Sequence, residues 1–219
     1  GAAIHRFLVP RVAPVAMHAA SAASAEPAAM PSLSTLWILA ATFTCNGFIF
    51  AAMAAHLPRV LQAAGCTPVA AVAAASLLGI AQVTARLADA GVLHRLHPLI
   101  SGRIAVALHP LGALLLLVFG APVAMLFTAL HGANIGLMTI VKGTLPLALF
   151  GSAGFGRRAG MLEAPSRVAQ ALAPVAFGLM LDAWGAQALW ISGAVGCAGL
   201  GGLLVLRTKN ARPNGVGCD

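Results

Sequence analysis

The sequence predicts an all-α membrane protein whose chain crosses a bilayer as six helices. Apolar residues make up 60% of the 219 residues, and Asp, Glu, Lys and Arg only 8%, whereas soluble domains carry about 25% charged residues. The charges lie between long, charge-free runs that are continuously apolar, whereas the strands of a membrane β-barrel would alternate. A soluble bundle of buried helices is also disfavoured, because most of its helices would need a polar face.

Each span is about 20 residues long, as a bilayer core of about 30 Å requires. The charge-free interval between Arg103 and Lys142 is too long for one helix, and Gly120 and Pro122 divide it at a tight turn. The predicted spans are Leu33–Ala55, Pro68–Ala88, Ser101–Phe119, Val123–Thr144, Ala159–Leu181 and Gln187–Leu206.

Basic residues fall in alternate connections, where the positive-inside rule places cytoplasmic segments. They precede the first span and follow the second, fourth and sixth: Arg6, Arg11, Arg86, Arg95, Arg103, Lys142, Arg157, Arg158, Arg207, Lys209 and Arg212. The other three connections contain only Arg59. This pattern predicts a multi-pass protein of the cell (inner) membrane with both termini in the cytoplasm. The net charge of +8 is thereby read as a topology signal and not as a nucleic-acid-binding surface.

The spans divide the chain into three parts. Residues 1–31 are rich in Ala, Ser and Pro and predict a cytoplasmic linker. Residues 32–207 form the six-helix transmembrane domain, and residues 208–219 a basic cytoplasmic tail. A chain that starts with Gly and a linker leads us to expect a piece of a longer protein, with a processed or misassigned start as the alternative.

No pattern in the sequence indicates a catalytic, metal or cofactor site. The four cysteines share no metal-ligand or disulfide spacing, and His94 and His97 have no third ligand nearby in the sequence. The glycine-rich run from Gly151 to Gly160 lacks the Lys-Ser/Thr pair of a phosphate-binding loop and does not follow a strand. We therefore expect neither an enzyme nor a nucleotide-driven pump, and no bound cofactor or metal.

The polar residues inside the fifth span are candidates for a solute or proton pathway. Glu163 and Arg167 are four residues apart and so share one helix face, with Gln170 close to it. Ionisable groups at membrane depth are costly and often mark pathways. A purely structural pair near the cytoplasmic end, reaching the interface by snorkelling, is the alternative. Pro165 and Pro174 are expected to bend this span.

Other spans carry uncharged polar candidates. His131 and Asn134 lie three residues apart in the fourth span, and a histidine can shuttle protons near neutral pH. Asn46 in the first span and Gln82 in the second are similar cases. Hydrogen bonds between helices are the alternative role for all four. His109, next to a proline in the third span, is expected to bond backbone groups that the proline frees.

Three motifs carry a family resemblance. The segment 85–91 after the second span, Ala-Arg-Leu-Ala-Asp-Ala-Gly, resembles a partial G-R-x-x-D-R-x-G signature, with Ala85 and Ala90 at two of its positions. The run from Pro165 through Pro174 to Gly185, and the run from His131 to Gly151, resemble two further helices of the same family. In this order, the motifs make residues 56–206 resemble the C-terminal six-helix half of a major facilitator superfamily transporter.

The resemblance implies specific roles. The six spans would correspond to helices seven to twelve of such a transporter, and residues 1–31 to its central cytoplasmic loop. Arg86 and Asp89 would belong to a cytoplasmic gating loop that controls conformational change without touching the solute. A complete transporter binds its solute between two six-helix halves, so an N-terminal half or a second copy is the expected partner.

The sequence thus favours a secondary active transporter that moves a small solute by alternating access, as part of a larger transporter. Proton coupling through Glu163, Arg167 or His131 is an associated expectation. A truncated or half-size membrane protein that packs with a partner chain without transporting is the alternative. A membrane-embedded enzyme is disfavoured, because no cluster of His, Asp or Cys lies at either membrane face.

Overall fold

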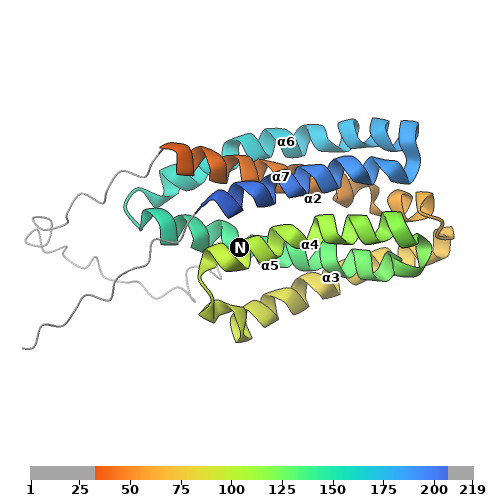
Figure 1. The fold of residues 1–219 in the computed structure, drawn as a ribbon, viewed down its shortest axis with the longest axis horizontal. Helices are drawn as coiled ribbons and strands as arrows, with labels where there is room; N and C mark the ends of the chain where they lie inside the picture. Colours follow the sequence, from red (N-terminus) through yellow and green to blue (C-terminus); the bar gives the residue numbers. More distant parts are fainter. Residues whose placement is uncertain (1–32, 207–219) are drawn as a thin grey trace, which may run out of the picture. The chain divides into compact units, whose positions relative to one another are not determined.

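The computed structural model describes residues 33–206, which form long helices joined by short turns (Figure 1). None of the residues in this range lies in a β-strand, which confirms the predicted all-α class. The long helices are α2 (Leu33–Ala63), α3 (Pro68–Gly91), α4 (Pro98–Phe119), α5 (Ala124–Phe150), α6 (Phe155–Trp184) and α7 (Leu189–Val205). Short 3₁₀ turns connect some of them: η1 (Leu93–Arg95), η2 (Ala121–Val123) and η3 (Gly185–Ala188). The predicted linker and basic tail lie outside the described residues.

Within this range, five helical segments are long and apolar enough to cross a membrane. Four correspond to α2, α3, α4 and α5, the last together with η2. The fifth, Phe155–Val205, takes α6, η3 and α7 together although Gly185 caps the end of α6, and it covers the last two predicted spans except for Leu206. These segments fit a multi-pass membrane protein.

Local sequence sets the helix ends. Thr67 caps α3, because its Oγ1 accepts a hydrogen bond from Ala70 N at 3.3 Å, and Pro68 follows at the first helical position. Gly120 and Gly151 end α4 and α5 with φ of 66° and 70°, a conformation that favours glycine. The predicted division of the long apolar interval at Gly120 is therefore confirmed.

Two predictions about local structure are wrong. Residues 85–91, which the motif resemblance places in a loop although the predicted span runs to Ala88, are the last turns of α3, because the run of Ala, Leu and Arg contains no helix breaker before Gly91. His109 does not bond the backbone freed by Pro110; its ring nitrogens contact two side chains instead. The helix α6 continues through both Pro165 and Pro174.

The helices pack in a pattern that repeats between the two halves of the sequence. The helix α2 packs on α6 and α7, while α5 packs on α3 and α4, and α4 meets α7. If α2 is exchanged with α5, α3 with α6, and α4 with α7, the same packed helix pairs result. The two groups of three helices are therefore equivalent in their contacts. Each group has three helices, and consecutive helices run antiparallel. The first helix of the second group, α5, would therefore run in the opposite direction to the first helix of the first group, α2.

The apolar core consists of two clusters, one towards each end of the bundle. One contains Ile49, Phe127 and Phe177, and the other Phe43, Leu145 and Leu162, among others. In each of four helices, buried polar residues lie in the sequence between the residues of one cluster and those of the other: Asn46 in α2, His109 in α4, His131 and Asn134 in α5, and Ser166 in α6. We call these five residues the polar layer.

Small residues bring α3 and α5 together. A Cβ added to Gly132 would lie 2.8 Å from Leu78 O, and one on Gly136 would lie 2.5 Å from Gln82 O. Both distances are too short for real contacts, so α3 touches α5 with its backbone. This is the close packing that small residues permit in membranes. The Gly132–Gly136 pair thus packs two helices of the same bundle against each other.

Candidate functional site

A polar cavity of about 300 Å³ lies beside the polar layer. Four helices wall it: α2, α3, α5 and α6. Its lining residues are Asn46, Gly47, Phe50, Gln82, Arg86, Ile135, Met138, Thr139, Lys142, Arg167 and Gln170. The exchange of the first three helices with the last three relates α2 to α5 and α3 to α6, so the four wall helices form two equivalent pairs.

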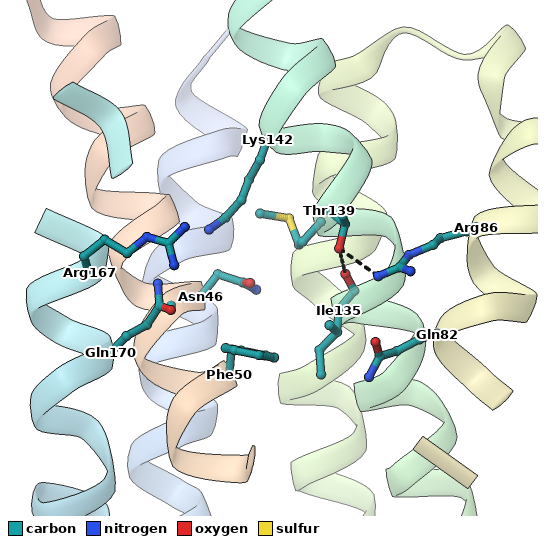
Figure 2. Close-up of a pocket in the computed structure, with 11 residues that line it drawn as sticks. Asn46, Phe50, Gln82, Arg86, Ile135, Thr139, Lys142, Arg167 and Gln170 are labelled. Atoms are coloured by element: carbon teal, nitrogen blue, oxygen red, sulfur yellow. Dashed lines mark hydrogen bonds between the residues drawn. The ribbon is translucent and has the colours of Figure 1, made fainter. Parts of the chain in front are cut away.

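The two opposite walls carry the same residue types. Arg167 and Gln170 come from α6 on one side, and Arg86 and Gln82 from α3 on the other (Figure 2). In each wall, the arginine and the glutamine are three or four residues apart and so lie on one helix face. Lys142 from α5 and Asn46 with Phe50 from α2 complete the lining between these walls. An occupant would meet a guanidinium and an amide on either side.

Glu163 lies next to this cavity and pairs with two of its cations. Its Oε1 is 2.9 Å from Lys142 Nζ, and its Oε2 is 3.9 Å from Arg167 Nε. The Lys142 pair is the closer one, and both of its side chains are 26% exposed, whereas the Arg167 side chain is 72% exposed. The predicted Glu163–Arg167 pair is therefore present, but its geometry is weaker than that of the Lys142 contact between helices.

Arg86 is held by a hydroxyl group. Its Nη2 donates to Thr139 Oγ1 at 3.3 Å, and Thr139 Oγ1 donates to Ile135 O at 2.9 Å (Figure 2). Among residues 33–206, no carboxylate lies within 4.0 Å of the Arg86 guanidinium. The other residue of the predicted gating segment, Asp89, is buried in the last turns of α3 and does not line the cavity.

Hydrogen bonds fix the uncharged side of the cavity. Asn46 Nδ2 donates to Asn134 Oδ1 at 3.3 Å, and Asn134 Nδ2 donates to Ala105 O at 2.7 Å, so α2, α5 and α4 are connected. On α6, Gln170 Nε2 donates to Ser166 Oγ at 3.1 Å. Ser166 Oγ donates in turn to Phe43 O at 3.0 Å, which connects α6 to α2. Asn134 thus lies behind the cavity and orients Asn46.

A second polar cluster, formed by His109, His131 and Ser192, is fully buried and away from the cavity lining. Nδ1 of His109 is 3.1 Å from Nδ1 of His131, and Nε2 of His109 is 3.2 Å from Ser192 Oγ. Phe127 stacks on the His131 ring with centroids 6.1 Å apart. We call this group the histidine cluster.

The hydrogen-bond order of this cluster follows from its last member. Ser192 Oγ donates its only proton to Leu189 O at 3.1 Å, so it must accept from Nε2–H of His109. A neutral His109 then accepts at Nδ1, and His131 donates from its own Nδ1. His131 Nε2 is left as a buried nitrogen without a hydrogen-bond partner among the described residues.

The structure therefore separates the residues that the sequence singled out. Arg167, Gln170, Asn46 and Gln82 line the cavity together, as does Arg86. Glu163 and Asn134 are in contact with lining residues, whereas His131 belongs to the histidine cluster.

As site residues, sequence reasoning missed Lys142, which it used only as a topology signal, and Thr139, which it left inside an apolar span. One signal could have found them. Residues 135, 138, 139 and 142 repeat at helical spacing, and residue 131 lies one turn before the first of them. Thr139 and Lys142 thus share one helix face with Ile135 and Met138, and two polar residues on that face of an apolar span were the available signal.

No group of three or more His, Cys, Asp or Glu among the described residues is placed to hold a metal ion. No protein-family model matches the chain, and no curated protein matches its sequence.

Proposed function

We propose that this chain is one six-helix half of a secondary active transporter, similar to the major facilitator superfamily, and that it moves a small solute by alternating access. The observation that carries the proposal is the polar cavity between α2, α3, α5 and α6. Solute sites of such transporters lie between repeated helical units near the middle of the membrane. The packing pattern, which is unchanged when the first three helices are exchanged with the last three, supports this reading.

We also propose that the chain crosses the membrane six times, with the start of α2 and the end of α7 on the cytoplasmic side. Successive helices joined by short turns alternate in direction, so α2 and α6 begin at the end of the bundle where α3, α5 and α7 finish (Figure 1). The basic residues at this end that do not line the cavity are Arg95, Arg103, Arg157 and Arg158. The opposite end has Arg59, which pairs with Asp182 at 2.5 Å. The positive-inside rule favours the first end as cytoplasmic.

A partner is part of the proposal. The cavity has walls from one six-helix bundle, whereas alternating access needs a second bundle to rock against the first. An N-terminal six-helix half or a second copy of the chain would supply it. The solute, the lipid bilayer and this second bundle are the partners that we infer, without a nucleic acid and without catalysis.

Solute-driven proton movement tests the function. The complete transporter, with the second bundle that the proposal requires, is reconstituted in vesicles that contain a pH-sensitive dye, and neutral sugars, amino acids, amines and organic acids are added one class at a time. We expect one class to change the internal pH, and Arg167→Ala to abolish that change while the protein level in the vesicles stays the same. Arg157→Ala, outside the cavity on the same helix, is the matched control.

The same assay decides against the alternative. A half-size protein that only packs with a partner would give no flux with any class, and wild-type and Arg167→Ala vesicles would behave alike. That outcome, repeated with radiolabelled solutes so that uncoupled movement is also seen, would contradict the proposed transport.

A further inference from the structure

We infer that the cavity takes a small organic anion, with a preference for a dianion whose two charged groups reach opposite walls. This inference rests on the proposed function, because it names the solute class of the same site. Among residues 33–206, three cationic side chains line the cavity, namely Arg86, Lys142 and Arg167, and no carboxylate does. The nearest carboxylate, Glu163, is shared between Lys142 and Arg167.

The charges do not balance. Three positive charges face one negative charge, so two positive charges remain uncompensated (3 − 1 = 2). The other two acids of the described range are not available to the cavity. Asp182 pairs with Arg59, and Asp89 lies within 4.0 Å of no cation of the described part of the chain. Unpaired charge within a membrane bundle is costly, and an anionic occupant would offset it.

The positions of the cations favour two anionic groups on one molecule. Arg86 and Arg167 come from opposite walls, and each planar guanidinium can form paired hydrogen bonds to a carboxylate or a phosphate (Figure 2). Gln82 and Gln170 lie beside them and can donate further hydrogen bonds to oxygen atoms. Two separated oxyanions would therefore satisfy both walls at once.

The rest of the lining limits the size and nature of the solute. The volume of about 300 Å³ is at the lower end of the range of about 300–1,000 Å³ found for ligand cavities. Phe50, Ile135 and Met138 supply an apolar surface between the charged walls. A short aliphatic body with an anionic group at each end fits this arrangement, whereas an amine would face two uncompensated positive charges.

The test uses three compounds of nearly equal shape that differ in charge: succinate, succinamate and succinamide, which carry two, one and no negative charges at neutral pH. Binding to the full chain in lipid nanodiscs is measured by calorimetry at low salt. We expect succinate to bind at least about tenfold more tightly than succinamide, a difference of about 1.4 kcal/mol, with succinamate between them. Glycerol 3-phosphate in a parallel arm distinguishes phosphate from carboxylate recognition.

Variants assign the effect to the cavity. We expect Arg86→Gln and Arg167→Gln each to weaken succinate binding by about tenfold or more while succinamide binding stays unchanged, because each removes one charge. Arg86→Lys keeps the charge and should retain more affinity than Arg86→Gln. The matched control is Arg95→Gln, which removes an exposed charge at the same end of the bundle. Elution as a single species from a sizing column verifies the fold of each variant.

Three results would overturn the inference. They are equal affinity for succinate and succinamide, absence of binding for all four compounds, and an equal loss in Arg95→Gln. The outcomes also separate this inference from the proposed function. Vesicles that respond to a sugar or an amine through Arg167 would keep the transport proposal and reject the anionic class. Tight succinate binding without any flux would keep the anionic class and reject the transport proposal.

Discussion

The cavity and the histidine cluster both hold polar side chains in the middle of an apolar bundle, but they satisfy them in opposite ways. In the histidine cluster, three buried side chains form one hydrogen-bond chain that ends at Leu189 O. In the cavity, charged side chains outnumber their partners and face an open space. The first arrangement stabilises the bundle, whereas the second leaves interactions for an occupant. Four predictions test this difference.

The largest effect is expected from His109→Ala, which removes the central member of the histidine cluster. We expect the free energy of unfolding to fall by about 3 kcal/mol, because a fully buried ring is lost and both of its partners lose a hydrogen bond. Thermal unfolding in detergent measures this loss, and succinate affinity should stay unchanged. His94→Ala, in the exposed η1 turn, is the control. A large loss of affinity without a loss of stability would mean that the cluster belongs to the binding site.

The next effect concerns Glu163, the one carboxylate of the described range that contacts the cavity cations. Glu163→Gln raises the uncompensated charge from two to three, so succinate should bind about fivefold more tightly at low salt, a gain of about 1 kcal/mol. The gain should shrink in 1 M salt, where charges are screened within about 3 Å. Asp182→Asn, at the other end of the bundle, should change nothing. Weaker binding in Glu163→Gln would show that the carboxylate helps to hold the solute.

Ser192→Ala should lower the free energy of unfolding by about 0.6 kcal/mol, the average worth of a polar contact within a membrane bundle. It removes the acceptor of His109 Nε2 and so breaks the ordered chain at its end. Ser76→Ala is the matched control, because Ser76 also donates to a backbone oxygen three residues earlier but is exposed. Equal thermal stability of both variants would contradict the assigned hydrogen-bond order.

The smallest effect is expected from Thr139→Val, which removes the hydroxyl that holds Arg86. Succinate affinity should fall by about twofold, about 0.4 kcal/mol, because Arg86 loses its fixed orientation but keeps its charge. Thr144→Val is the control, since Thr144 makes the same bond to a preceding carbonyl and contacts no cation of the cavity. Titration calorimetry resolves this difference. A tenfold loss would make Thr139 a direct ligand of the solute.

Composition and periodicity were enough to predict the helical class and the approximate helix positions. The helix positions predicted from the apolar runs, from Gly120 and from Pro68 depend only on local sequence, and the structure agrees with them. The predicted spans were too short at several ends, because helices continue beyond an apolar core as long as no residue breaks them. The run from Ala85 to Gly91 is the clearest case: a motif suggested a loop, whereas helix propensity decided the structure.

The candidate site was predicted only in part, for a physical reason. Residues on one helix, such as Glu163 and Arg167, can be paired from their spacing, because the helix fixes their distance. The contact between Lys142 and Glu163 joins two helices and depends on how these helices pack. Likewise, His131 and Asn134 share one helix face, yet one belongs to the histidine cluster and the other bonds to Asn46. Only the packed bundle separates them.

The close contact of α3 with Gly132 and Gly136 has a consequence for selectivity. The helix α3 carries Gln82 and Arg86, and the missing side chains of these two glycines determine how near that wall can approach the others. Adding a single methyl group at Gly136 would push α3 outward and enlarge the opening. Under the proposed function, the width of the cavity would thus be set by two positions that do not line it.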